Sequence, residues 1–272
     1  MFNYAIFRKT CFDSAWSLAL SAGGLVAFVI MFVWAMLNMG TQILEFVAQF
    51  PFIRKIFEMG FGINVDGDVS MNILFAVVFT HAVVLALTWT VIIAATTRVT
   101  AGEIERGTAD MLLSLPVNRT EVYISTTLAW VLIAGILSAC PVGGIGIAAQ
   151  VFETEEAVEL SKYLAPALNF CCLNLAVGGI SSLISCCLNR RGLAVGTTVA
   201  ALLTSAVLTF LEPFIEFIKT IRFLSLLNYF RPVDIVRTGE WPMSQMLTLV
   251  ILGTVAWTAG LILFARKDIP TA

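Results

Sequence analysis

Six long apolar runs without a single Asp, Glu, Lys or Arg constrain this chain more than any other feature of its sequence. A helix needs about 20 mainly apolar residues to cross the hydrocarbon core of a bilayer, and each run is close to or above that length. Only 12% of the residues are charged, against about 25% in soluble domains. We therefore predict an all-α membrane protein, with residues 1–272 forming one domain. The predicted spans are residues 15–37, 72–96, 122–147, 164–188, 193–211 and 246–264.

A seventh apolar segment, residues 213–230, differs from these because it contains Glu216, Lys219 and Arg222. Each charge near the bilayer centre costs about 2.5 to 3.5 kcal/mol on insertion scales, so we do not expect this segment to cross. Its apolar residues recur at steps of three and four, which favours an interfacial or re-entrant helix on the extracytoplasmic side.

Four other stretches carry local signals. Apolar residues at helical spacing on both sides of Pro51, in residues 43–50 and 52–57, predict two short interfacial helices. Residues 2–16 are imperfectly amphipathic and are expected to lie along the inner surface before the first span. The run CPVGGIG at 140–146 is expected to bend or fray the third span near its outer end.

The distribution of charge predicts the orientation. Six spans place both termini on one side of the membrane. If that side is cytoplasmic, the inner segments hold nine Lys/Arg and six Asp/Glu, whereas the longer outer segments hold seven and twelve. Because basic residues are denser in the short inner segments, the positive-inside rule favours cytoplasmic termini. We expect a multi-pass protein of a prokaryotic plasma or inner membrane, with residues 100–123 in the cytoplasm.

Polar residues inside the spans are few. Transporters driven by ion gradients generally need ionisable groups within the membrane, and the only candidate is His81. This histidine is interpreted either as a hydrogen-bonded residue between helices or as a proton carrier. Asn169, Asn174 and Thr197 either face a transport pathway or bond to a neighbouring helix. If this bundle moves a substrate uphill, its energy enters from outside the membrane.

Small residues in the fourth and fifth spans predict close helix packing. They recur four apart in the fourth span, and Gly192 and Gly196 form a GxxxG pattern in the fifth. The partner is either another helix of the same chain or a second copy. The two Cys-Cys pairs of the fourth span begin fifteen residues apart, roughly 22 Å along a helix, so no metal site is predicted from them.

Motifs for catalysis and nucleotide binding are missing. The sequence contains no HExxH metal motif, no readable GxSxG nucleophile turn and no GxxxxGK[ST] phosphate loop. We predict that the chain is not an enzyme and binds no cofactor of its own.

The segment 100–123 combines charged and apolar residues between two spans. Gly107 permits a tight turn, Thr108 is a suitable helix cap and Pro116 ends the short helix between them. Asn118 followed by Glu121 resembles a capping box that begins the third span. The predicted short helix has an apolar face of Met111, Leu112 and Leu115, surrounded by Glu103, Glu105, Arg106, Asp110 and Arg119.

Two interpretations of this segment remain open on physical grounds. A short, stiff knob joined directly to two spans suits insertion into a cleft of another protein, because a push on it is passed to both spans. Alternatively, it is a solvated turn whose leucines rest on the membrane surface.

The run GEIERGTADMLLSLPVNRTEVY resembles the cytoplasmic loop of type-2 ATP-binding-cassette (ABC) permeases. In that family a glutamate-rich turn, Gly-Thr, a leucine pair and Pro-x-x-Arg recur. Residues 224–242 are similar, more loosely, to the family's outer segment before the last span, and six spans with both ends inside also match. The residues that carry the first resemblance are Glu103, Glu105, Gly107, Thr108, Leu112, Leu113, Ser114, Pro116 and Arg119.

The resemblance implies a permease subunit that works as a homo- or heterodimer. Each copy would seat a cytoplasmic ABC ATPase subunit, which binds ATP and Mg²⁺, and the segment 100–123 would supply the coupling helix. The resemblance favours an exporter that alternates between inward- and outward-facing states, embedded in lipid, with an extracytoplasmic partner allowed and no nucleic acid. The alternatives are a force-transmitting or regulatory membrane subunit that does not itself transport, and a static membrane anchor.

Overall fold

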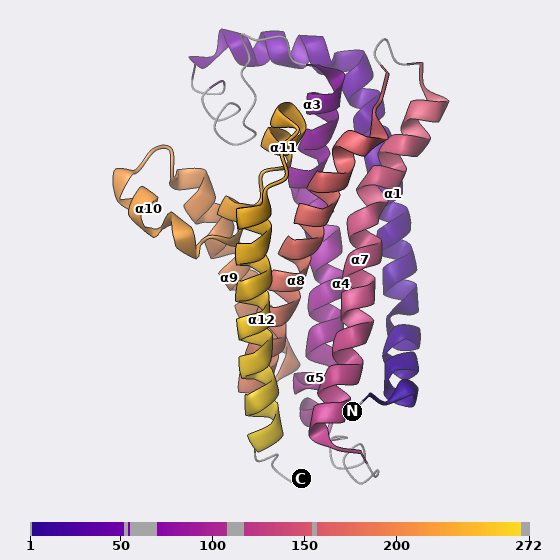
Figure 1. Ribbon diagram of the computed structural model, residues 1–272, viewed down its shortest axis with the longest axis vertical. Coiled ribbons are helices and arrows are strands. Elements are labelled where there is room, and N and C mark those ends of the chain that lie inside the picture. Colours follow the sequence, from indigo (N-terminus) through magenta and orange to yellow (C-terminus); the bar gives the residue numbers. More distant parts are fainter. Residues whose placement is uncertain (1, 52–53, 55–69, 108–116, 154–156, 268–272) are drawn as a thin grey trace.

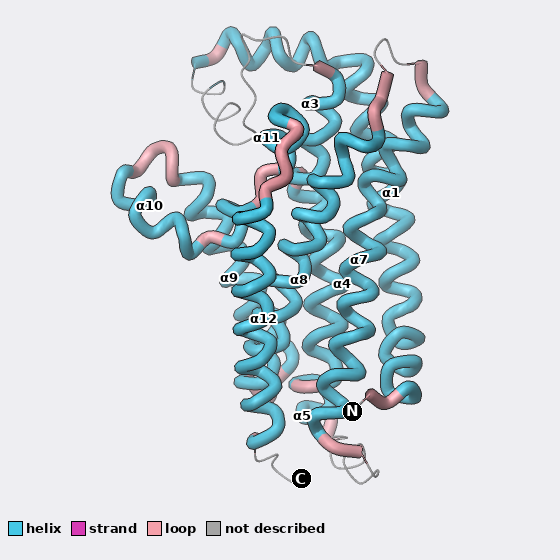
Figure 2. The backbone as a smooth tube through the Cα atoms, in the orientation of Figure 1, coloured by secondary structure: helices cyan, strands magenta, loops and turns pink. Residues whose placement is uncertain are grey.

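The computed structural model describes residues 2–51, 54, 70–107, 117–153 and 157–267, and every regular element in these ranges is a helix. The helices form an elongated bundle (Figures 1 and 2). Six helical stretches in these ranges are long and apolar enough to cross a membrane, which confirms the all-α class and the predicted number of candidate spans. These helices cover Tyr4–Gly40, Met71–Val99, Arg119–Val151, Leu160–Cys187, Arg191–Leu211 and Met243–Arg266.

The first helix is longer than the predicted span. α1 (Tyr4–Gln49) begins where the side chain of Asn3 accepts hydrogen bonds from the backbone of Ala5 and Ile6. Residues 43–49, expected to form a separate interfacial helix, instead continue α1, whose last part crosses the top of the bundle in Figure 1. That expectation was wrong because nothing before Phe50 interrupts the helical backbone. The second expected helix, at 52–57, lies outside the described residues apart from Arg54.

The second span is not one helix. It consists of α3 (Met71–Ala76), the 3₁₀ turn η1 (Val77–Thr80) and α4 (Ala82–Val99), with an extended residue at His81 (φ −65°, ψ 133°). Such a break leaves backbone groups without helical partners, which is costly in a membrane. Here the imidazole Nδ1 of His81 accepts a hydrogen bond from the Val83 N–H at 3.3 Å and so caps α4.

The third span begins as predicted but does not fray. α7 (Arg119–Val151) starts with the expected capping box, in which the Asn118 N–H donates to the Glu121 carboxylate. The helix passes through Pro141 and continues to Val151. Packing explains this: a Cβ added at Gly144 would lie 2.7 Å from the Cβ of Val29, so α1 rests directly on this part of α7.

The centre of the bundle is α8 (Leu164–Cys187), which follows the 3₁₀ turn η2 (Leu160–Tyr163) and packs along α12 (Met243–Arg266). The two backbones touch: a Cβ at Gly179 would lie 2.2 Å from the carbonyl oxygen of Gly253. A Cβ at Gly178 would meet the Trp130 ring of α7 at 2.4 Å. The small residues of the fourth span therefore pack within the chain.

The fifth span lies at the side of the bundle. α9 (Arg191–Leu211) buries Ala194, Thr198, Leu202 and Ser205 and leaves most of its length exposed. Residues 213–230 form short pieces instead of a seventh candidate span: α10 (Glu216–Ile221), η3 (Arg222–Leu224) and η4 (Leu226–Tyr229).

Figure 1 shows α10 projecting sideways beside α9, and α11 (Pro232–Thr238) near α3 at the upper part of the bundle. The Ser225 hydroxyl ties the lateral pieces to α9, because it donates to the Ser205 carbonyl oxygen at 2.8 Å. α11 ends at Gly239, whose φ of +71° closes the helix in the left-handed region.

Candidate functional site

The segment between the second and third spans lies at one end of the bundle, at the bottom of Figure 1 near the label α5. α4 ends at Val99, α5 (Ala101–Glu105) follows, and Gly107 has a φ of +68°, as a tight turn at a glycine requires. We call this the junction end, defined by Glu105, Arg119, Arg191 and Lys267. The middle of the predicted coupling helix lies outside the described residues: Thr108, Met111, Leu112, Leu115 and Pro116.

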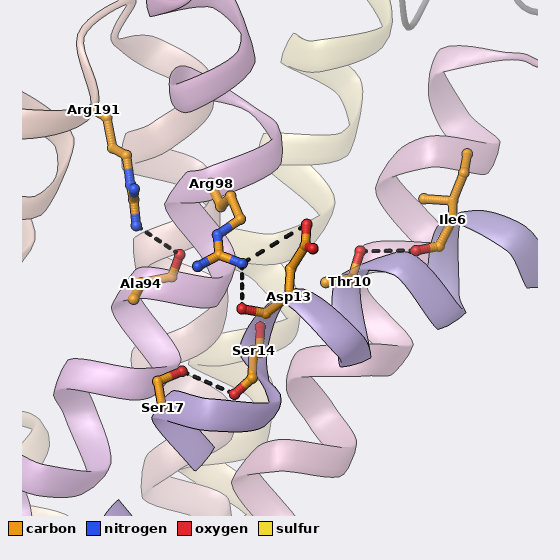
Figure 3. A network of polar contacts seen from close by, with 8 residues as sticks. All are labelled: Ile6, Thr10, Asp13, Ser14, Ser17, Ala94, Arg98 and Arg191. Atoms are coloured by element: carbon orange, nitrogen blue, oxygen red, sulfur yellow. Dashed lines mark hydrogen bonds and ion pairs between the residues drawn. The ribbon is translucent and has the colours of Figure 1, made fainter. Parts of the chain in front are cut away.

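The first half of the segment is bonded to the start of α9. The Glu105 carboxylate accepts a hydrogen bond from the backbone N–H of Arg191 at 2.9 Å, which satisfies one donor at the positive end of that helix. The Arg191 guanidinium reaches the other way, to the Ala94 carbonyl oxygen at 3.4 Å (Figure 3) and the Thr97 hydroxyl at 3.5 Å. Arg191 thus joins α9 to α4 and Glu105 joins it to α5.

A buried row of hydroxyls joins α4 to α8 just inside this end. The Thr96 and Ser181 oxygens lie 2.7 Å apart, and the Thr100 hydroxyl bonds to that of Ser185. Ser185 also accepts from the Ala101 N–H at 3.2 Å, so the row continues into α5. Hydroxyl pairs of this kind hold membrane helices together without placing a charge in the bilayer.

The second half of the segment is bonded to the other side of the bundle. The Arg119 guanidinium donates to the Lys267 carbonyl oxygen just beyond α12. The Lys267 ammonium donates to the carbonyl oxygens of Cys186 at 2.8 Å and Leu188 at 3.2 Å, at the negative end of α8. Burial lowers the pKa of the Lys267 ammonium below its ordinary value.

α1 is attached at the same end. The Arg98 guanidinium donates to the Asp13 carbonyl oxygen at 2.6 Å and forms a longer ion pair with its carboxylate at 3.9 Å (Figure 3). The Asn3 N–H donates to the Ser125 hydroxyl of α7 at 2.8 Å. Each of the six candidate spans is therefore connected to another by a side chain at the junction end.

The remaining predicted residues of the segment lie around these contacts. Glu103 and Arg119 are half-buried, and Glu105 is exposed. Sequence reasoning missed Arg98, Arg191 and Lys267 as contact residues. They entered the sequence argument only as positive charges, because the carbonyl and hydroxyl groups that receive them come from distant parts of the chain.

The four predicted pathway or packing residues lie apart from one another. His81 caps α4 and packs against the Phe28 ring at a centroid distance of 4.7 Å. Asn169 and Asn174 are fully buried; their amides donate to the Tyr229 carbonyl oxygen at 3.3 Å and to the Ser138 hydroxyl at 2.9 Å. Thr197 is exposed on α9.

The part of the chain that the structure describes contains no group of three His, Cys, Asp or Glu side chains that could hold a metal ion. Among the described residues, the contacts at the junction end are helix caps, hydroxyl pairs and the Arg98–Asp13 ion pair, all of which join one helix to another.

Comparison with known proteins agrees with this architecture. No curated protein matches the chain. The family model described as ABC-2 family transporter protein matches residues 4–269, which is nearly the whole sequence. With six apolar helices, the chain is a multi-pass membrane protein. It belongs to the ABC-2 family of transporter proteins, as a membrane permease.

Proposed function

We propose that this permease is the membrane-spanning subunit of an ATP-driven exporter, and that a separate ATPase subunit docks on the segment 100–123. The observation that carries the proposal is the junction end: Glu105 is bonded to the start of α9, and Arg119 is bonded through Lys267 to the end of α8. A displacement of the segment would be passed to several spans at once.

The source of energy follows from what the membrane region lacks. The six predicted spans contain no Asp, Glu, Lys or Arg, so an ion gradient has no ionisable group to act on apart from His81. ATP and Mg²⁺ would be held by the ATPase subunit. To drive alternating access, that subunit must bind the two states of the permease with different affinity, and the segment is where it would make that distinction.

In this proposal the junction end faces the cytoplasm, as the charge distribution favours. A reporter that is active only in the cytoplasm is expected to be active when inserted at Gly107 and inactive at Gly239, which lies in the loop before α12. The opposite result at both positions would place the segment outside and exclude the docking of a cytoplasmic ATPase.

A second copy of the permease would complete the transporter. Within the described part of the chain, a Cβ added at Gly192 or Gly196 of α9 would meet no atom within 4 Å, so the GxxxG face is open. This leaves it free to pack against another chain. Replacing Gly196 with Leu is expected to shift a cross-linked dimer towards monomer, whereas Leu at Gly135, an equally open position on α7, leaves it unchanged.

The decisive experiment is to co-purify the permease with the ATPase from a neighbouring gene and measure substrate transport in vesicles. Leu112→Asp and Leu115→Asp are expected to reduce ATPase binding and transport by about tenfold, because a charge on an apolar docking face costs more than 1.4 kcal/mol. Leu224→Asp, an exposed leucine of η3, is the matched control.

Unchanged ATPase binding and activity in both leucine variants would contradict the coupling role. Nucleotide-dependent binding of an extracytoplasmic protein without transport would favour the alternative, a membrane subunit that transmits the state of the ATPase.

A further inference from the structure

The two ends of the segment 100–123 are bonded to different helices of the bundle, and these helices differ in how closely they pack against the rest of the chain. Within the part of the chain that the structure describes, the Glu105 carboxylate is bonded to the start of α9, whereas Arg119 leads through Lys267 to the end of α8. The consequence depends on how α8 and α9 are packed.

The part reached through Arg119 is rigid. α8 and α12 approach so closely that a Cβ at Gly253 would lie 2.9 Å from the Cα of Ala176, and one at Gly260 would lie 3.1 Å from the Cα of Leu183. Backbones in contact at two levels of the helix leave no space for one to slide past the other.

The part reached through Glu105 is held by fewer contacts within this chain. α9 buries few side chains, and its firm polar attachments lie near its two ends: Arg191 at the junction end and Ser205, with Ser225, farther along. Between them, Thr198 and Thr204 bond within the helix, to the carbonyl oxygens four residues before. Within this chain, the contacts of Glu105 and Arg191 are therefore the polar contacts that hold the junction end of α9.

From these observations we propose that Glu105 is a positioning residue that couples the segment to α9, so that α9 moves as a lever against the fixed pair α8–α12. The proposal rests on the proposed function, since it assigns the helix on which the docked ATPase acts. The carboxylate is suited to this role because it both accepts the first N–H of α9 and carries a negative charge at the positive end of that helix.

The test measures the distance between α9 and α12 in lipid nanodiscs. Spin-labelled noncanonical residues at Val199 and Val255, on α9 and α12, leave the six native cysteines in place. In the permease alone, Glu105→Ala is expected to raise the population with a displaced α9 about fivefold, the typical effect of losing a helix cap, and Glu105→Gln less, because its amide oxygen still accepts.

Glu121→Ala is the matched control. Glu121 also accepts a backbone N–H at a helix start, that of Asn118, but its helix is α7, which is packed against α1 and α8. The distance distribution between α9 and α12 is expected to stay unchanged in this variant. An unchanged distance distribution in Glu105→Ala, or an equal change of the distribution in Glu121→Ala, would overturn the proposal.

The second measurement uses the permease bound to its ATPase. A non-hydrolysable ATP analogue is expected to shift the distance in the wild type, and Glu105→Ala is expected to abolish the shift while ATPase binding persists. A shift that persists in Glu105→Ala, or no shift in the wild-type complex, would exclude Glu105 as the coupling residue. If no ATPase binds the wild type, the proposed function fails, while the measurement on the permease alone still decides whether Glu105 holds α9.

Discussion

α8 and α9 are consecutive helices of similar hydropathy that occupy opposite environments. Their most apolar windows have mean hydropathies of 1.8 and 1.9, yet 61% of the window is buried in α8 and 22% in α9. Both helices contain glycines, but an added Cβ would meet the Trp130 ring at Gly178 and the backbone of Gly253 at Gly179, whereas at Gly192 and Gly196 it would meet no atom of the described chain within 4 Å. Two helices of nearly equal hydropathy can therefore differ in burial, one lying at the centre of the bundle and the other at its side.

The difference shows what small residues accomplish in a membrane. Because lipid is as apolar as leucine, burying an apolar side chain there yields little, and a helix becomes central only where its backbone can be approached closely. Gly178 and Gly179 permit this approach on two sides of α8, to Trp130 and to Gly253. α9 has the same kind of residue without a partner in the chain.

The largest expected change in stability comes from replacing a glycine at one of these helix contacts with a larger residue. Gly179→Leu places a side chain where the carbonyl oxygen of Gly253 lies, 2.2 Å from the new Cβ. We expect a loss of about 3 kcal/mol or more in the free energy of unfolding, at the upper end for overpacking. Thermal unfolding in detergent measures it, and Gly196→Leu serves as the matched control with no expected loss in the monomer. Equal loss in both variants would show that α9 is as tightly packed as α8.

A smaller effect is expected from the buried amide of α8. Ser138→Ala removes the acceptor of the Asn174 amide, whose side chain is fully buried and whose Oδ1 atom already has no partner among the described residues. The loss should be about 1–2 kcal/mol in the same unfolding assay.

Thr204→Ala removes a hydroxyl from exposed α9 that bonds only to its own helix, at the Ala200 carbonyl oxygen. This control should change stability by less than about 0.5 kcal/mol. A larger loss in Thr204→Ala than in Ser138→Ala would reverse the comparison between the two helices.

The smallest expected change in the free energy of unfolding comes from Lys267, which is bonded to the end of α8. Burial lowers the pKa of Lys267 below its ordinary value of 10.5. Between the lowered pKa and 10.5 the unfolded chain binds more protons than the folded chain, so the free energy of unfolding should rise with pH across that interval. Below the lowered pKa both states carry the charge, and this contribution no longer varies with pH.

In Lys267→Met the free energy of unfolding should not rise with pH across that interval. At neutral pH it should be lower than in the wild type by about 0.5 kcal/mol, because the hydrogen bonds to α8 are missing. Unfolding of both proteins over an alkaline pH series provides the measurement. Identical pH slopes would show that Lys267 is not desolvated at the end of α8.

Hydropathy alone predicted the number and approximate position of the six spans, because the cost of charge in lipid depends on composition and not on tertiary contacts. The start of α7 was also predictable, since the capping box of Asn118 and Glu121 is local in sequence. Gly107 likewise adopts the turn that its residue type suggests.

The errors arose where tertiary contacts outweigh local signals. Of the bend or fraying expected at residues 140–146, the fraying does not occur, because α1 packs against Gly144 one turn after Pro141. The helix break at His81 could not be predicted, because the residues beside it include neither proline nor glycine. The partners of Arg191 and Lys267 could not be found either, since their acceptors are backbone carbonyls or hydroxyls on other helices, which sequence does not distinguish from the rest.

The break at His81 has a mechanical consequence for the second span. The hydrogen bonds of the backbone on its two sides meet at a single extended residue: His81 donates back to Val78 and accepts from Leu85. We therefore expect a rotation of α4 to be taken up in part by the backbone dihedral angles of His81, so that α3 turns less than α4. The second span is thus two helical segments, α3 with η1 and α4, that meet at a single residue.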